Sequence, residues 1–432
     1  MSWAKLIVVT LAGALGAVMA NRGIAVFHDG LRPVMPELIE GRMRRIELAS
    51  IAFGLSFGLV IGFGIPFSLT SAILLVHCLW LGTDIIGTWF PGSFEKDWMK
   101  DRRSVMGLIG SAVGGALYGA LLVVGLQAIV KLFERLPVKV FDSLGQLGDP
   151  IVFAFAVFPA VAVAYQYGIK NGIIAFVITV LGRQIASALG QAKPDGWALA
   201  VGVVVLAIYA MREKKGAEVG ESKATVFAER AGRIRRNLPW IAVTGALYGI
   251  ACNLAIMMEG PQSLTALAQG DRASAINITI ARALAFIPLK AMTSLATGVF
   301  VTDGFGFVAT AGLVVGNVVL AAIAGAIVMS IEALSLVVVG QFLDRFPGMQ
   351  RAADNIRTAM TRLLEIATLV GSMMAANTFA PGLGFFGVAG IYLLNEAAGT
   401  PVVRMAIGPI GAIIVGVLVN VLAVFGLYKP PA

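Results

Sequence analysis

Residues 48–83 constrain the fold more than any other part of this sequence, because they contain no Asp, Glu, Lys or Arg. A helix that crosses a bilayer needs about 20 consecutive apolar residues, so this segment is too long for one such helix. The glycines and the proline of residues 62–66 (GFGIP) predict a break inside it. We therefore expect two membrane-spanning helices here, separated at that break.

Similar apolar segments recur along the chain, and the composition argues against a soluble fold. Charged residues make up only 13% of the sequence, whereas a soluble domain carries about 25%. We expect an all-α polytopic membrane protein with about 11–13 transmembrane helices, some of them broken or re-entrant. The apolar run within residues 1–24 resembles a signal peptide, but we interpret it as an uncleaved first transmembrane helix.

The net charge of +9 indicates cytoplasmic loops rich in Lys and Arg rather than a nucleic-acid surface. The clearest such loop is the basic linker 212–236, which separates residues 25–211 from residues 237–432. These two parts share three short segments in the same order: 42–46 with 233–237, 81–87 with 300–306, and 132–137 with 342–347. We expect two repeated halves with a substrate site at their interface, as in many secondary transporters. Whether the repeat is parallel or inverted stays open, although the two arginine clusters favour parallel.

Acidic residues inside apolar segments are candidates for ion coupling, because a charge in the bilayer is costly and usually marks a pathway. Asp84 follows Thr83 at the end of the first uncharged run, and Asp303 follows Thr302 in the matching segment. Glu332 interrupts another apolar run. We expect the three carboxylates to bind H⁺ or Na⁺, and Thr83 to contact substrate. The alternative is that they are ordinary helix caps at the interface.

Lys290 is expected to bind substrate, because it lies beside a proline that predicts a broken helix with exposed backbone amides. Arg282 is a second cation in the same segment. The two lie about 12 Å apart along a helix, so at least one is expected to snorkel to the interface. Asn395 and Glu396 close a later apolar run and are further substrate candidates. Their alternative is an interfacial turn in which Glu396 pairs with an arginine at position 404.

Residues 25–45 form the most polar segment of the N-terminal region. It contains His28, Asp29 and Arg32, which we expect to contact substrate, and prolines at positions 33 and 36 that forbid a plain helix. We expect a short re-entrant or gate-like element, with Glu37 and Glu40 joining these residues in an ion-pair latch. A cytoplasmic loop is the alternative.

Sequence motifs of enzymes are missing: there is no Walker A sequence, no HExxH and no GxSxG. Cys78 and Cys252 both lie in apolar runs, which excludes a CxxC metal site. We expect no enzymatic activity, no cofactor and no bound metal.

The segment AVFHDG at residues 25–30, continued by Arg32, the two prolines and LIEG at residues 38–41, resembles the signature of the YhfT family of bacterial inner-membrane proteins. The resemblance covers nearly the whole chain and extends through residues 50–56, 83–84, 237–239, 296–298, 354–357 and 394–396. It implies a multi-pass transport protein of the inner membrane. A weaker similarity, at the level of fold, links the broken helices and repeated halves to elevator-type carriers and to phosphotransferase permeases of the galactitol and ascorbate type.

The sequence therefore predicts a secondary transporter of a small polar or anionic metabolite, driven by H⁺ or Na⁺ through alternating access. The alternative is a phosphotransferase-type permease that works with a soluble phosphoryl carrier. The expected partners are the lipid bilayer, the small-molecule substrate, the coupling ion and a second copy of the chain in a homodimer, with no nucleic acid.

Overall fold

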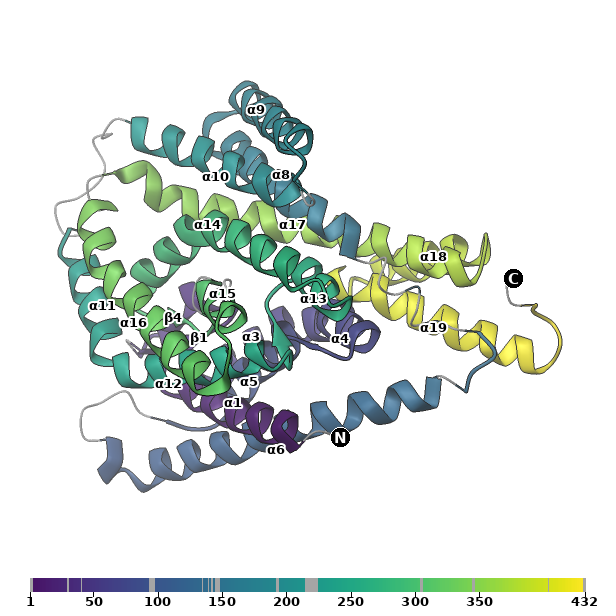
Figure 1. Ribbon diagram of the computed structural model, residues 1–432, viewed down its shortest axis with the longest axis horizontal. Coiled ribbons are helices and arrows are strands. Elements are labelled where there is room, and N and C mark those ends of the chain that lie inside the picture. The colour runs from purple at the N-terminus through teal and green to yellow at the C-terminus, as the bar shows by residue number, and fades with distance from the viewer. Residues whose placement is uncertain are drawn as a thin grey trace.

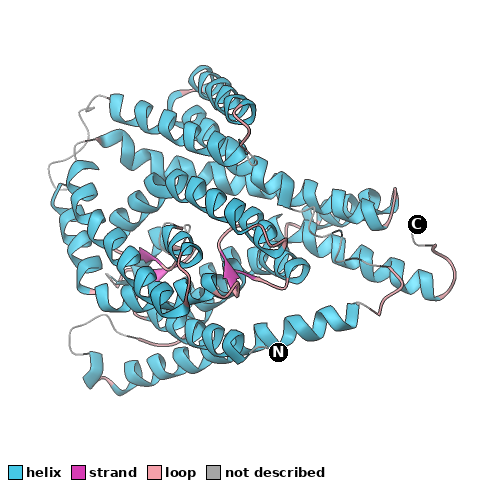
Figure 2. Cartoon of the chain, viewed as in Figure 1, coloured by secondary structure: helices cyan, strands magenta, loops and turns pink. Residues whose placement is uncertain are grey.

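The protein is described here by a computed structural model that covers residues 3–28, 31–39, 41–92, 98–133, 135–138, 140, 143, 148–191, 194–213, 224–303, 306–343, 346–402 and 404–429. Almost all of the regular structure in these ranges is helical (Figure 2). Four strands of two residues each are the exception. The all-α fold class expected from the sequence is confirmed.

The N-terminal elements are mostly helices interrupted by two of the short strands (Figure 1). They are α1 (Trp3–Asn21), β1 (Ala25–Val26), η1 (Arg32–Val34), α2 (Met35–Ile39), α3 (Arg45–Leu59), η2 (Val60–Gly64), α4 (Ile65–Ser71), β2 (Leu74–Leu75), α5 (Val76–Trp89), η3 (Trp98–Lys100) and α6 (Arg102–Phe133). Three longer helices follow, α8 (Gly148–Tyr167), α9 (Ile169–Ala188) and α10 (Pro194–Arg212).

The C-terminal elements contain the other two strands. They are α11 (Ala224–Arg236), α12 (Leu238–Asn253), β3 (Met257–Met258), α13 (Pro261–Ala268), α14 (Arg272–Thr297), β4 (Phe300–Val301), α15 (Phe307–Val314), α16 (Val318–Leu343), α17 (Pro347–Phe379), α18 (Leu383–Ala397) and α19 (Arg404–Val424).

Seven helices in the described ranges are long and apolar enough to cross a membrane, which makes this a membrane protein. They contain the segments Trp3–Asn21, Arg102–Leu126, Ile169–Ala188, Pro194–Arg212, Val318–Leu336, Thr358–Phe379 and Ala406–Val424. The expected count of 11–13 also included short and broken segments. Three shorter apolar helices, Ala156–Tyr167, Leu238–Asn253 and Leu383–Ala397, are of that kind.

The expected helix breaks are displaced in the structure. Residues 62–66 do not end a helix, since the chain passes through the π-helical turn η2 directly into α4. The break comes later, at Ala72, whose φ of 58° is left-handed. α14 likewise continues through position 288, so the proline expected to break it does not. Prolines are tolerated in membrane helices because neighbouring groups satisfy the backbone groups that they free.

A left-handed residue stands two positions before each of the four strands. These residues are Gly23, Ala72, Ala255 and Gly298, with φ between 51° and 68°. A left-handed residue ends a helix by turning the chain away from the helix axis. Two of the four are alanines, which adopt this conformation at a cost of about 1–2 kcal/mol. The surrounding packing therefore holds the breaks in place.

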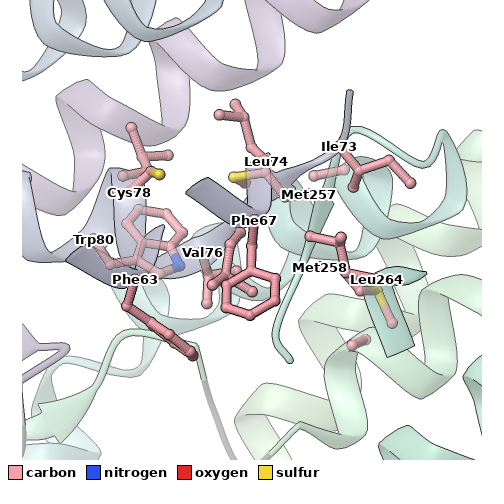
Figure 3. Close-up of a cluster of buried hydrophobic side chains, with 14 of the residues drawn as sticks. Phe63, Phe67, Ile73, Leu74, Val76, Cys78, Trp80, Met257, Met258 and Leu264 are labelled. Atoms are coloured by element: carbon pink, nitrogen blue, oxygen red, sulfur yellow. The ribbon is translucent and has the colours of Figure 1, made fainter. Parts of the chain in front are cut away.

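The strands pair in parallel across the two parts of the chain. β1 pairs with β4 in the register Ala25↔Phe300, and β2 pairs with β3 in the register Leu74↔Met257. The side chains of β2 and β3 are buried in the main hydrophobic core, together with Phe63, Phe67 and Trp80 (Figure 3). The strand pairs thus bring four helix breaks into the interior of the protein.

Close helix packing surrounds these strand pairs. α1 packs along α6, and α12 packs along α16. A side chain at Gly115 would collide with the carbonyl oxygen of Gly13, and one at Gly325 would collide with that of Gly245. Glycines let helix backbones approach closely in membranes. A second group of helices, α8, α9, α10 and α17, packs around its own core.

Candidate functional site

An ionisable side chain follows each of the four strands within two residues. His28 comes after β1 and His77 after β2, and they are the chain's only histidines. Glu259 comes directly after β3, and Asp303 follows β4. Because the strands pair, their ends carry these groups into the buried centre of the protein. Glu259 and Asp303 are each only 1% exposed.

Asp84 is held by the backbone that follows β1. The backbone N–H of Phe27 donates to its Oδ2 at 3.0 Å, and that of His28 donates to the same oxygen at 2.9 Å. Arg32 is fully buried beside it and donates from Nη1 to the carbonyl oxygens of Val26 and Phe27, both at 3.3 Å. On this side of the centre, the backbone therefore satisfies both a carboxylate and a guanidinium.

Side chains, rather than backbone, satisfy the carboxylates that follow β3 and β4. Nζ of Lys290 lies 3.0 Å from both oxygens of Asp303 and 3.4 Å from Oε1 of Glu259. Nε of Arg282 lies 3.4 Å from the same oxygen of Glu259. Oε2 of Glu259 is buried without a hydrogen-bond partner among the described residues. It faces Gly306, where any side chain would collide with it.

One face of α14 supplies both cations. Arg282, Phe286 and Lys290 follow one another at intervals of four residues, which places them on the same face of the helix. Both cations also lie over the Phe286 ring, at 5.2 Å and 5.9 Å from its centroid. The expectation that at least one of them snorkels is wrong, because buried Glu259 pairs with both: the Lys290 side chain is 7% exposed and that of Arg282 is 19% exposed.

These residues form one charge cluster, which we call the central cluster. Its members are Asp84, Glu259 and Asp303, and Arg32, Arg282 and Lys290. Asp303 and Asp84 both act electrostatically on Arg32, which links the two sides of the centre. The three negative and three positive charges balance. Buried charges are tolerated when they are paired in this way, and removing one partner is strongly destabilising.

A pocket adjoins the central cluster, between α10 on one wall and α13 and α14 on the other. Its empty volume is about 850 Å³ counted to its open mouth. The lining combines polar and apolar groups: Ala156, Gln191, Asp195, Gly196, Trp197, Leu199, Gly260, Pro261, Gln262, Ser263, Ser274, Asn277, Ile278, Ala281, Arg282 and Phe286. This mixture of polar and apolar groups is typical of small-molecule sites. Arg282 belongs to both the pocket and the central cluster.

Thr83 and Glu332 are both buried. The Thr83 hydroxyl donates to the carbonyl oxygen of Trp80 within α5, next to Asp84. Glu332 is 6% exposed and lies in α16. Its burial agrees with the expectation of an unusual intramembrane carboxylate, and its role in ion coupling stays a prediction.

Asn395 and Glu396 lie at the end of α18, away from the strand pairs (Figure 1). The Asn395 amide exchanges two hydrogen bonds with the backbone of Val402, at 2.9 Å and 3.0 Å. Glu396 binds Arg404 through two contacts of 2.9 Å. The ion pair expected from the sequence is confirmed, and it stabilises the turn between α18 and α19. The structure does not bring these residues to the central cluster.

The expected latch in residues 25–45 stays a prediction, because the structure describes only three of its five members, His28, Arg32 and Glu37. Glu37 pairs with Arg42 at 2.7 Å on the surface, whereas Arg32 turns inward to the backbone after β1. Asp29 and Glu40 lie outside the described residues. The two prolines do prevent a single helix, because the chain forms the short elements η1 and α2 instead.

Glu259 is the residue that sequence reasoning missed. It stands in the segment MMEGP, where a carboxylate ends an apolar run just before Gly-Pro. The segments around Asp84 and Asp303 were matched by sequence, but they do not occupy equivalent positions. Asp303 lies two residues after β4, whereas Asp84 lies well inside α5. Asp303 lies two residues after β4, and His77 lies two residues after β2, so these two residues occupy corresponding positions.

Among the residues that the structure describes, no group of three or more His, Cys, Asp or Glu side chains is placed to hold a metal ion. The central cluster instead alternates carboxylates with Lys and Arg. These side chains form ion pairs with one another.

These features define a helical membrane protein with a buried charge cluster beside a pocket. The family model YhfT, described as a protein of unknown function, matches residues 5–428. An uncharacterized protein YhfT of Escherichia coli (strain K12) is 38% identical over 99% of both chains. The chain therefore belongs to the YhfT family. No solved structure matches it.

Proposed function

We propose that this protein is a secondary transporter that moves a small polar or anionic metabolite across the bacterial inner membrane, coupled to H⁺ or Na⁺. The observation that carries the proposal is the contact between the pocket and the central cluster through Arg282. Ionisable groups buried among membrane helices are costly, and they typically serve ion or substrate pathways.

The two parts of the chain support an internal repeat, as transporter folds often have. The order helix, strand, helices, strand, two helices occurs in α1–α6 and again in α12–α16. Asn21 ends α1 and donates to the carbonyls of Gly87 and Phe90, and Asn253 ends α12 and donates to those of Gly312 and Val315. We infer that each half begins with α1 or α12. The first helix then belongs to the first repeat.

The arrangement of the helices also favours alternating access of the elevator kind. The pocket lies between α14, which belongs to the group containing the four strands, and α10, which belongs to the group around α8, α9 and α17. Sliding of one group against the other would carry the Arg282 side of the pocket past the α10 side. Asp303 and Glu259 are the proposed coupling carboxylates, with Glu332 as a further candidate. For Asp84 we propose a structural role instead, because backbone N–H groups bind it.

Reconstitution into proteoliposomes tests the proposal. Substrate uptake and proton entry, reported by a trapped pH-sensitive dye, are recorded while a panel of sugars, sugar acids, amino acids and carboxylates is applied. Substrate uptake that disappears with a protonophore, or on removal of Na⁺, is the expected result. Absence of any substrate uptake with correctly folded protein would contradict the proposal.

A phosphotransferase-type permease is the second candidate, favoured by the polar lining of the pocket. Such a protein would hand its substrate to a soluble phosphoryl carrier. Uptake into the same proteoliposomes distinguishes the two, because a secondary carrier accumulates unmodified substrate without any soluble partner. Dependence on a phosphoryl donor and a soluble carrier would favour the permease. We further propose that the protein functions as a homodimer.

A further inference from the structure

Arg282 contacts both the pocket and the central cluster. It lines the pocket, and it pairs with Glu259, whose side chain is only 2% exposed. Because Gly260 has no side chain, the guanidinium of Arg282 is accessible from the pocket. A Cβ atom at residue 260 would lie 2.6 Å from Nη1 of Arg282. A guanidinium binds a carboxylate with two parallel hydrogen bonds in its preferred geometry. An anion in the pocket would therefore compete with Glu259 for the same cation.

We propose that Arg282 exchanges Glu259 for the carboxylate of a hydroxylated small-molecule substrate, and that Glu259 takes up one proton in this exchange. The inference rests on the proposed transport function, and it names the substrate class and the coupling residue. The proton comes from solvent and forms an O–H bond on the carboxylate of Glu259. The substrate adds one negative charge and the proton removes one, so the charge of the buried site is unchanged.

The pocket lining indicates the substrate class. Arg282 supplies the positive charge. Asp195, the only carboxylate among the described lining residues, is neutralised by Arg183 at 2.7 Å. Amide and hydroxyl side chains surround the rest of the pocket: Gln191, Gln262, Ser263, Ser274 and Asn277. These groups bind hydroxyl groups, whereas Trp197 and Phe286 offer apolar faces to carbon atoms. A sugar acid has this combination of one carboxylate and several hydroxyls.

The helix that begins at the pocket adds to the attraction for an anion. α13 starts at Pro261, and no side chain caps its N-terminus at Gly260. The backbone N–H groups of a first helical turn favour negative charge. Because Gly260, Pro261, Gln262 and Ser263 all line the pocket, this helix end and Arg282 act on the same space.

A proton suits Glu259 better than a metal ion does. Arg282 and Lys290 of α14 both face the Glu259 carboxylate, and their positive charges would repel a metal ion at this position. The other neighbours of Glu259 come from several elements. Asp303, after β4, pairs with the same Lys290. Tyr248 and Cys252 of α12 lie within electrostatic range of Glu259, and Gly306 faces its Oε2. Farther out, Arg282 and Lys290 also act on His77, and Asp303 acts on Arg32.

Equilibrium binding to the purified full-length protein in detergent tests the exchange. The probe is gluconate, and its uncharged relative sorbitol is the matched ligand control. Gluconate affinity is measured by titration calorimetry from about pH 5 to about pH 8. The wild type should bind gluconate but not sorbitol, and its apparent Kd should rise about tenfold per pH unit where Glu259 is ionised in the free protein.

Four variants separate the roles of the two partners. Glu259→Gln removes the carboxylate that competes with the ligand for Arg282, so gluconate should bind tightly with no dependence on pH. Glu259→Gln combined with Arg282→Gln leaves no unpaired buried charge and should bind no gluconate at any pH. Arg282→Gln alone should also lose binding. Arg362→Gln removes a cation that pairs with Glu365 at the surface, and should behave as wild type.

Three results would overturn the inference. These are no gluconate binding by the wild type at acidic pH, pH-independent binding by the wild type, or an unchanged pH dependence in Glu259→Gln. If pH-independent binding accompanied proton-driven substrate uptake into proteoliposomes, the exchange would be wrong and the transport function would stand. If proton-linked binding occurred without any transport, the transport function alone would be wrong.

Discussion

The two sides of the central cluster satisfy their charges in different ways. After β1, backbone groups bind the charges: N–H groups hold Asp84, and carbonyl groups hold Arg32. After β3 and β4, side chains of α14 bind Glu259 and Asp303. Backbone groups within packed elements cannot change partners without local unfolding, whereas Lys and Arg side chains change partners by rotation. The comparison therefore assigns a structural role to the first side and an exchangeable role to the second.

The two parts of the chain also differ in the type of residue that follows each strand. The histidines follow β1 and β2, whereas the carboxylates follow β3 and β4. His77 is packed edge-to-face against Phe27 and Phe63, with ring centroids 4.9 Å and 4.8 Å away. The His77 ring therefore packs as part of the hydrophobic core. If the halves are repeats, then histidines of the N-terminal half occupy the positions at which the C-terminal half has carboxylates.

Lys290→Met should have the largest effect of any single change. It leaves Glu259 and Asp303 buried with one cation fewer, which costs about 3–5 kcal/mol of stability. The expected result is a large fall in the thermal unfolding midpoint of the detergent-purified protein. Lys290→Met combined with Asp303→Asn should recover much of the loss. Equal instability of the single and double variants would contradict the pairing.

Asp84→Asn should have a smaller effect, and only on stability. It weakens the charged hydrogen bonds from Phe27 and His28, which are worth about 1.5–3 kcal/mol each in proteins. The unfolding midpoint should fall, while the pH dependence of gluconate binding should remain that of wild type. A flattened pH dependence would show that the β1 side also exchanges protons, and would remove the distinction between the two sides.

Gly260→Ala should change binding more than stability. The added methyl group meets Nη1 of Arg282, which is the flexible end of a side chain and can move away. Gluconate affinity should fall several-fold, with a shift of the unfolding midpoint that is small beside that of Asp84→Asn. Gly232→Ala, where a side chain meets open space, is the matched control. Unchanged affinity in Gly260→Ala would separate Arg282 from the ligand.

Arg42→Gln should have the smallest effect, because the Glu37–Arg42 pair is exposed. Hydrogen bonds from Arg42 lower the pKa of Glu37. Any stabilisation from this pair is therefore present above the ordinary pKa of a carboxyl group, and is lost as the pH falls through the lowered value. We expect unfolding midpoints equal to wild type near neutral pH. A large loss would contradict the small contribution expected of this exposed pair.

Much of the fold was predictable because apolar length and charge depend on local sequence. The membrane class, the buried carboxylates at Asp84 and Asp303, and the pair of Glu396 with Arg404 all follow from such local patterns. The positions of the helix breaks did not follow, since Ala72 and Ala255 adopt left-handed conformations that tertiary packing imposes on residues with no preference for them.

The composition of the site was harder to predict than its existence. Glu259 and Lys290 are 31 residues apart and belong to different elements, and no local sequence pattern indicates that they pair. Parallel pairing between two-residue strands leaves no periodic signal. The sequence therefore pointed to Lys290 as a substrate ligand, whereas the structure shows it bound to two carboxylates.

Proton uptake on ligand binding tests the central claim most directly. Gluconate is added to the purified protein in weakly buffered detergent solution at neutral pH, and the pH change is followed with an indicator dye. The exchange at Arg282 predicts uptake of about one proton per gluconate bound by the wild type, and none by Glu259→Gln. Binding without proton uptake by the wild type, or equal uptake by both proteins, would contradict it.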